Sequence, residues 1–249
     1  MRLVDDLVGD LIGFFQKRSV QVAVLSEYGI TEVDTPIHLN RLFRRHGWLA
    51  IKDELGLETL DCGASKVFAV ADHQVAHIYL NDRALESKVR AALESEPGVE
   101  LVLDHAAQTE WGIRHRRGGD LIAVAGPRCW FTYYYWEDDA LAPDFARTVD
   151  IHRKPGYDPA ELFLDPKLRW PRLRIAAFLL RKKLGIRGLL DVIPLDASLV
   201  RGSHGRRSED ENEWPVLLLE KHHSPANAEK KPDATGVHDE LLRYIDPFP

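Results

Sequence analysis

The feature that most constrains the fold of this chain is a short apolar run, SVQVAVLS, at residues 19–26. Its β-branched and aliphatic residues occur with little polar alternation, which is typical of a strand covered on both faces in a parallel sheet. A strand of this kind requires neighbouring strands. We therefore expect an α/β protein, because helices cover both faces of such a sheet.

Patterns on either side of this run agree with an α/β fold. Apolar residues at three- and four-residue spacing from Leu3 to Phe15 predict a helix. Thr35 as an N-cap and Pro36 as the first helical residue predict a second helix over IHLNRLFRRHGWL. The order helix, strand, helix favours a partial three-layer α/β/α sandwich with a mostly parallel sheet.

The middle of the chain predicts a different arrangement. KVFAVAD, VAHIYLN, VELVL and DLIAVAG are strand-like, and ALESKVRAALES has helical periodicity. The aromatic run from Cys129 to Trp136 predicts a core cluster, with base stacking as the alternative. We therefore expect an inserted, cap-like α+β region at residues 60–136. It would separate two parts of the core, 1–59 and 137–221, and a mobile tail would follow at 222–249.

Composition narrows the possible partners. A net charge of -6 over 249 residues argues against a surface that neutralises a nucleic acid polymer, whereas a small phosphorylated substrate remains compatible. Cys62 and Cys129 form neither a disulfide framework nor a CxxC zinc motif, which fits a reducing cytoplasm. Asp5, Asp6 and Asp10 interrupt the first apolar segment, so we expect no signal peptide and no membrane partner. An oligomer is possible.

Two short motifs carry the candidate chemistry. LSEYGI follows the early apolar run at Leu25–Ile30, and RGSHGR, at Arg201–Arg206, precedes the apolar segment WPVLLLE. The pair resembles the SDHG-like and GTHG-like or GSHG-like motifs of the alkaline phosphatase superfamily, in its type I phosphodiesterase and nucleotide pyrophosphatase branch. The resemblance implies a two-metal site, with zinc expected and manganese as the alternative. By position, Glu27 matches a carboxylate ligand, Tyr28 an imidazole ligand, and His204 the late histidine.

The chain departs from this family pattern in two respects. Tyr28 is a neutral phenol with an ordinary pKa near 10, and it is a poorer metal ligand than an imidazole. The family's nucleophile and several of its ligands lie well upstream of the first motif, so the chain resembles a carboxyl-terminal portion of the family fold. We assign no catalytic residue and expect the nucleophile upstream of Met1.

The segment DIHRKPGYD, residues 150–158, is a second candidate. Asp150 and His152 are suited to binding a metal ion, and Lys154 is suited to binding a substrate phosphate. The alternative is a rigid structural loop. Tyr28, by its position beside the predicted metal site, is also a candidate substrate-binding residue. In ADHQVAH, strand alternation can place His73 and His77 on one face, and a structural pair is the favoured interpretation.

The sequence therefore predicts a metal-dependent hydrolase of phosphate esters or phosphodiesters, with Glu27, His204, Asp150 and His152 as metal ligands. The alternative is a noncatalytic remnant or interaction domain of the same fold, so whether the chain is an enzyme stays open. The hydrolase hypothesis requires the loops of Glu27 and His204 to face a common pocket.

Overall fold

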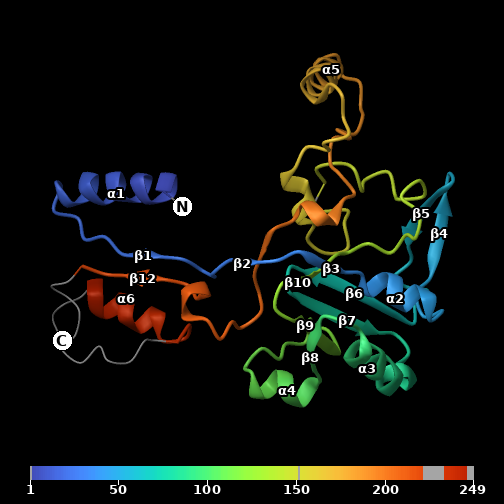
Figure 1. Cartoon of the computed structure of the whole chain (residues 1–249), viewed down its shortest axis with the longest axis horizontal. Helices are drawn as coiled ribbons and strands as arrows, with labels where there is room; N and C mark the ends of the chain where they lie inside the picture. Colours follow the sequence, from blue (N-terminus) through green and yellow to red (C-terminus); the bar gives the residue numbers. More distant parts are fainter. Residues whose placement is uncertain (1, 151, 221–232, 246–249) are drawn as a thin grey trace. The chain divides into compact units, whose positions relative to one another are not determined.

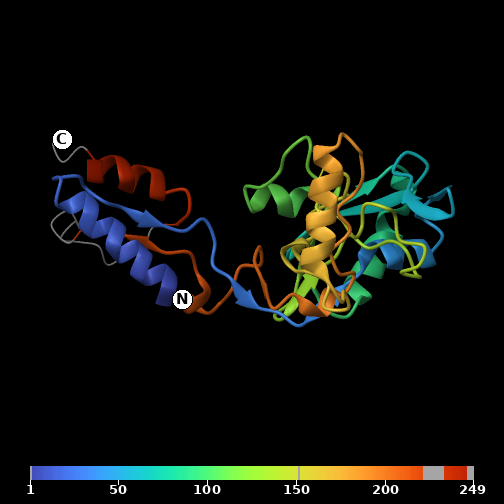
Figure 2. The same ribbon diagram turned by 90° about the horizontal axis from the view of Figure 1, so that it is seen from above.

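The computed structural model describes residues 2–150, 152–220 and 233–245, which form two compact units (Figures 1 and 2). Unit 1 comprises Met1–Gly29 and Asp210–Pro249, and unit 2 comprises Ile30–Glu209. These boundaries differ from the four regions expected from the sequence. The chain passes from unit 1 into unit 2 within the first motif, between Gly29 and Ile30, and returns just after the second motif, at Asp210.

The described residues of unit 1 form α1 (Arg2–Gln16), β1 (Val24–Leu25), a 3-10 turn (Glu211–Glu213), β12 (Leu217–Leu218) and α6 (Val237–Ile245). β1 pairs antiparallel with β12, and the Ser26 and Val216 backbones continue this pairing. The expected parallel strand covered on both faces is wrong for this segment, because within the described residues β1 has β12 as its one partner and Leu25 is half exposed. An apolar run indicates burial but cannot specify the partner strand.

The end of the chain contains more structure than expected. Residues 222–232 and 246–249 of the expected tail region lie outside the described residues, so the prediction of mobility is not addressed there. Val237–Ile245, in contrast, forms the helix α6. Its Tyr244 is 3% exposed and donates a hydrogen bond to the Val22 carbonyl at 3.0 Å, which fixes this helix within unit 1.

Unit 2 is built around an antiparallel sheet in the order β6-β7-β9-β8. The sheet strands are β6 (Val67–Asp72), β7 (Val75–Leu80), β8 (Val99–Leu103) and β9 (Leu121–Ala125). α3 (Glu86–Ser95) buries Val89 and Leu93 in the main core, whereas α4 (His105–Glu110) covers a small cluster on the other face around Ile122 and Val124. All five residues of β9 are buried, because this strand has side chains in both clusters.

The remaining strands of unit 2 are short. The other elements of unit 2 are β2 (Thr31–Glu32), β3 (Thr35–Ile37), α2 (Leu39–Arg45), β4 (Ile51–Glu54), β5 (Leu57–Leu60), β10 (Cys129–Phe131), α5 (Pro171–Lys183), β11 (Gly202–Ser203) and 3-10 turns at Arg83–Leu85, Pro159–Leu162 and Ala197–Leu199. The prediction that Thr35 caps a helix is wrong: Thr35 and Pro36 lie in β3, and α2 begins at Leu39. β3 pairs in parallel with β10, and this long-range pairing overrides the local capping signal.

The aromatic run forms the centre of the core, as the sequence predicts. Trp130, Phe131 and the four aromatic residues from Tyr133 to Trp136 are at most 2% exposed. The α/β class is confirmed, since helices and sheet strands contribute side chains to the same main core cluster of unit 2. Among the strand pairs that the structure describes, β3–β10 is parallel and the others are antiparallel. The expected parallel arrangement is therefore present only in that pair.

Candidate functional site

The two predicted motifs fall in different units. Glu27 and Tyr28 belong to unit 1, whereas His204 belongs to unit 2. Glu27 is exposed and Tyr28 is 46% exposed. The convergence of Glu27 and His204 on one pocket therefore stays a prediction.

Backbone packing accounts for two residues of the first motif. The Ser26 hydroxyl accepts a hydrogen bond from the Val216 amide at 3.0 Å, so Ser26 belongs to the pairing between the two ends of unit 1. At Gly29, a Cβ atom would lie 1.7 Å from the Glu213 carbonyl oxygen. Only glycine fits this close approach.

The second motif lies beside the β6–β7 hairpin. β11 pairs antiparallel with β2, so Ser203 lies opposite Thr31 and the chain then leads into His204. Gly205 follows with φ of +111°, a conformation that favours glycine. The His204 carbonyl accepts a hydrogen bond from the Gln74 amide at 2.9 Å, which attaches the GSHG loop to the hairpin.

The hairpin brings a second histidine against His204. His73 and Gln74 form the two-residue turn between β6 and β7, and His73 has φ of +57°, which is uncommon for a residue other than glycine. The ring centroids of His73 and His204 are 3.9 Å apart, and His73 Nδ1 lies 3.3 Å from the Ser203 hydroxyl oxygen. Both imidazoles are half-buried. The structure thus forms an imidazole pair at the second motif.

Gln74 fixes the position of this pair. Its side chain is 1% exposed and donates from Nε2 to the Cys129 carbonyl at 3.1 Å. Its Oε1 accepts from the Thr31 hydroxyl and from the Arg206 amide, each at 3.4 Å. A single buried amide therefore connects β10, β2 and the GSHG loop at the point where the two imidazoles meet.

The segment DIHRKPGYD contributes an aromatic ring to the same site. The Tyr157 ring stacks on His73 with centroids 4.8 Å apart, and the Tyr157 amide donates to the Ala71 carbonyl at 2.8 Å. Gly156 pairs with Ala71 and has φ of +126°; a Cβ atom there would lie 2.3 Å from the Ala71 oxygen. The loop thus packs directly on β6, and Tyr157 and His204 both contact His73.

Lys154 has a different role from the one expected. Its ammonium is fully buried and lies 2.8 Å from Asp158 Oδ2 and 2.7 Å from Glu161 Oε1. Burial raises the pKa of the Asp158 carboxyl, while Lys154 acts against this rise. The expected contact between Lys154 and a substrate phosphate is not compatible with this burial. Lys154 instead neutralises carboxylates inside unit 2, and this part of the loop is structural.

The other predicted ligands do not complete a metal site in this structure. Asp150 is half-buried and His152 is exposed. Throughout residues 2–150, 152–220 and 233–245, no three His, Cys, Asp or Glu side chains are grouped so as to hold a metal ion. The metal-ligand roles of Asp150 and His152, like that of Glu27, stay predictions.

The environment of His73 keeps its ring neutral. Burial, together with the nearby His204, lowers the pKa of His73 to about 4, while Asp72 acts in the opposite direction. A neutral imidazole has one donor and one acceptor nitrogen. When the Ser203 hydroxyl donates to Nδ1, Nε2 carries the hydrogen and can donate to a phosphoryl oxygen. In the other tautomer, Nε2 offers a lone pair to a cation or a proton.

The sequence interpretation missed the role of His73. It paired His73 with His77, but His77 lies within β7 and its Nδ1 accepts a hydrogen bond from the Gly119 amide at 3.1 Å. Two residues between strand-like runs are typical of a hairpin turn. This spacing could have placed His73 at the tip, outside the strand alternation. No sequence pattern near His73 predicts its contact with His204.

The fold and the site define an α/β protein with an imidazole pair at a GSHG loop. Comparison with known proteins then gives its family: the type I phosphodiesterase / nucleotide pyrophosphatase family matches residues 1–158, and the chain belongs to this family. No curated protein matches the sequence. In the described part of the chain, every helix is too short or too polar to cross a membrane.

Solved structures with similarity to this chain include two kinds of enzyme. Phosphonoacetate hydrolase from Sinorhizobium meliloti 1021, in complex with phosphonoformate, is 18% identical over 44% of this chain and 27% of that chain, with a TM-score of 0.32. Murine ectonucleotide pyrophosphatase / phosphodiesterase 5 is 20% identical over 51% and 31%, with a TM-score of 0.35. The matched part therefore spans less than a third of each of these proteins.

Proposed function

We propose that this chain contributes the late-histidine part of a metal-dependent site that hydrolyses phosphate esters or phosphodiesters. The contact between His204 and His73, with ring centroids 3.9 Å apart, is the observation that supports the proposal most directly. His204 is the histidine of the motif that resembles the family's metal-binding GSHG. The neutral imidazole of His73 beside it adds a second ring that could supply a nitrogen ligand at this position.

The residues that the structure groups together provide only part of a metal site. Zinc in proteins has three or four protein ligands. His73 and His204 provide two, and unit 2 adds no third grouped ligand within its described residues. The pair alone therefore does not fit a two-ion centre, and we derive no reaction step through a metal. Zinc, with manganese as the alternative, stays part of the proposal on the strength of the family membership.

The chain's own residues support binding of a compact anion. His73 is neutral at pH 7 and is held by Ser203, Tyr157 and the buried amide of Gln74. Such a preorganised imidazole can donate one hydrogen bond to a phosphoryl oxygen without first losing a proton. An approaching phosphate would raise the pKa of His73, because a nearby negative charge favours the protonated ring.

Zinc titration by calorimetry tests the metal part of the proposal. We expect the unmodified chain to bind zinc and the His204→Ala and His73→Ala variants to lose affinity by about tenfold or more. His105→Ala is the matched control, because this histidine lies on α4 and interacts with Asp120 at 3.9 Å. No zinc binding by the unmodified chain, or equal affinity in all variants, would contradict the proposal.

Turnover is tested separately with p-nitrophenyl phosphate and its diester analogue, bis-p-nitrophenyl phosphate, in zinc or manganese. No residue of this chain is matched to the family's nucleophile, so we expect little or no turnover from this chain by itself. Rapid metal-dependent hydrolysis would show that the chain carries its own nucleophile.

A noncatalytic interaction domain of the same family is the second candidate. Tyr28, at the position where the family motif has a histidine, favours it because a phenol is a poor ligand for zinc. This candidate predicts neither zinc binding nor turnover. The same titration therefore distinguishes the two functions.

A further inference from the structure

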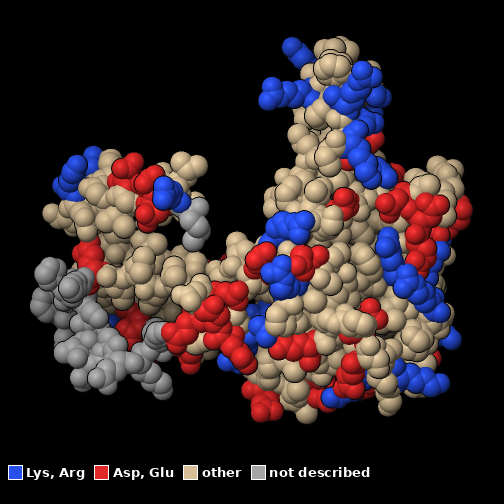
Figure 3. Space-filling model, in the orientation of Figure 1, with Lys and Arg blue, Asp and Glu red and all other residues tan. Residues whose placement is uncertain are grey.

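The helix α5 (Pro171–Lys183) has an unusual charge distribution. The segment 167–190 contains eight lysines and arginines and no aspartate or glutamate, although the whole chain has a net charge of -6. Figure 3 shows Lys and Arg side chains gathered over this helix. The cations are Lys167, Arg169, Arg172, Arg174, Arg181, Lys182, Lys183 and Arg187. This concentration indicates a surface that favours a negatively charged partner.

One side of α5 attaches it to unit 2. Ile175 is half-buried and packs against a small core cluster of Ala160, Val192 and Ile193. Arg174 and Asp191 form an ion pair at 2.8 Å. Figure 2 shows α5 from the side, along its full length. None of its residues is fully buried.

The opposite side of α5 carries an apolar stripe. Leu173, Ala177, Leu180 and Leu184 follow one another at spacings of four, three and four residues, which places them on one face of a helix. The three leucines are 59–68% exposed. At about 100° per residue, Ile175 lies on the other side of the helix from this stripe. The stripe is therefore turned away from the cluster that holds α5 in place.

Cations flank the stripe on both edges. By the same helical geometry, Arg172 and Lys183 lie along one edge, and Arg181 lies along the other, on the side of the Arg174 that pairs with Asp191. Long lysine and arginine side chains can keep their charges in the polar layer while their stems cover apolar surface. An apolar stripe between two cationic edges is typical of a helix that lies in the interface of an anionic bilayer.

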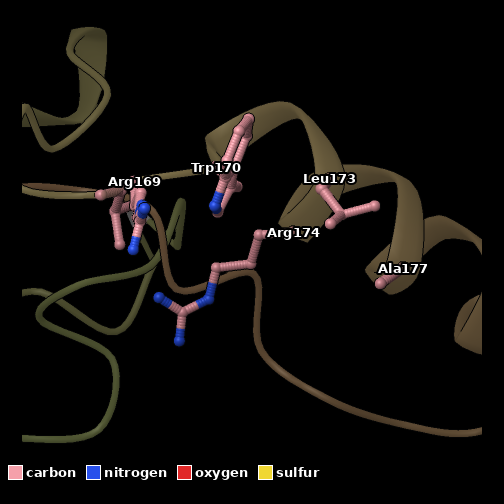
Figure 4. Close-up of a pocket in the computed structure, with 6 residues that line it drawn as sticks. Arg169, Trp170, Leu173, Arg174 and Ala177 are labelled. Atoms are coloured by element: carbon pink, nitrogen blue, oxygen red, sulfur yellow. The ribbon is translucent and has the colours of Figure 1, made fainter.

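The start of the helix adds an aromatic residue and a shallow pocket. Trp170, which is 67% exposed, precedes Pro171, and tryptophan favours the boundary between water and lipid. A pocket of about 310 Å³ lies here, lined by Leu168, Arg169, Trp170, Leu173, Arg174 and Ala177 (Figure 4). Guanidinium groups beside apolar side chains match the phosphate and acyl parts of a lipid headgroup region.

We propose that α5, with Trp170 and the flanking cations, is a peripheral docking surface for an anionic lipid bilayer. This inference differs from the sequence expectation of no membrane partner, which considered only signal and spanning segments. It is independent of the hydrolase proposal. The charge complementarity and the two cationic edges favour a bilayer over a protein groove, which would not require cations on both sides of the stripe.

Cosedimentation of the full chain with vesicles tests the proposal. We expect binding to vesicles of phosphatidylcholine with phosphatidylserine and not to phosphatidylcholine alone. Binding should fall in salt of about 1 M, where the screening length is about 3 Å. Equal binding to both vesicle types, or no binding to either, would overturn the proposal.

Matched variants distinguish an effect of the α5 surface on vesicle binding from an effect of the protein's net charge. Arg181→Gln, Lys182→Gln and Lys183→Gln together should lower the partition coefficient by about two orders of magnitude, since each cation near an anionic surface contributes about fivefold. The control carries Arg114→Gln, Arg116→Gln and Arg117→Gln, which remove the same charge from an exposed loop. An equal loss in the control would overturn the proposal.

The apolar stripe is tested by Leu180→Gln with Leu184→Gln, both exposed, so these changes should leave the thermal unfolding midpoint unchanged. We expect weaker vesicle binding, whereas Leu55→Gln with Ile113→Gln, also exposed, should have no effect. If the stripe variant instead converts a dimer into a monomer in the absence of vesicles, the surface is a protein interface and the bilayer proposal is wrong.

Discussion

His73 shows how a single position acquires a role from its surroundings. It adopts a positive φ at a hairpin tip, and its ring lies against Tyr157 and His204. A strained conformation persists only where the neighbouring structure fixes it, and such positions occur often at functional sites. Here the fixed partners are the Gln74 amide network and the loop that ends at Asp158.

Lys154 illustrates the opposite outcome, a charged residue used for stability. We expect Lys154→Met to lower the free energy of unfolding by about 3–5 kcal/mol, because Asp158 and Glu161 would remain buried without their cation. Urea denaturation measures this change. Lys88→Met, on the exposed surface of α3, should change the same quantity by less than about 0.5 kcal/mol. Equal values for the two variants would show that the buried ion pairs contribute little.

At the scale of elements, the site depends on short segments attached to a rigid sheet. The β6–β7 hairpin belongs to the four-stranded sheet, while the GSHG loop and the loop at residues 154–158 pack on it from different parts of the sequence. Rigid strands with functional loops at their ends are a common arrangement in binding sites. α5 differs, because it contacts unit 2 along one side only.

The contact of the second loop with β6 leads to an element-level prediction. Gly156→Ala should destabilise unit 2 by about 1–3 kcal/mol, since a Cβ atom would lie 2.3 Å from the Ala71 oxygen and φ is +126°. It should also displace Tyr157 and shift the NMR signals of the His73 ring. Gly188→Ala, where nothing lies within 4 Å, is the control and should leave both measurements nearly unchanged. Unaltered His73 signals in Gly156→Ala would contradict the proposed packing.

At the scale of the whole molecule, the chain forms two units that each combine distant parts of the sequence. Unit 1 joins the first residues to the last through the β1–β12 pair and the Tyr244 hydrogen bond. Unit 2 contains the aromatic core, the four-stranded sheet and the imidazole pair. The buried hydrophobic clusters lie in unit 2, whereas Tyr244 is the one buried residue among the described residues of unit 1, so we expect most of the core stability to reside in unit 2.

This division predicts that residues 30–209 fold by themselves. We expect this fragment to keep the near-ultraviolet circular dichroism of the buried aromatic cluster at Trp130–Trp136, because the hydrophobic core cluster to which these residues belong is formed by residues of unit 2. A cooperative thermal transition should accompany the signal. Loss of both signals in the fragment would show that unit 1 is required for the core of unit 2.

The sequence by itself indicated the family and the aromatic core, and it predicted His204 as a site residue, because each of these depends on local motifs or on hydrophobicity. Only the tertiary structure decided that His73 is the partner of His204, that Lys154 is buried, and that β1 pairs with the far end of the chain. The physical reason is that strand pairing and side-chain packing join residues far apart in sequence. The sequence of an isolated segment does not specify which distant segment will pack against it.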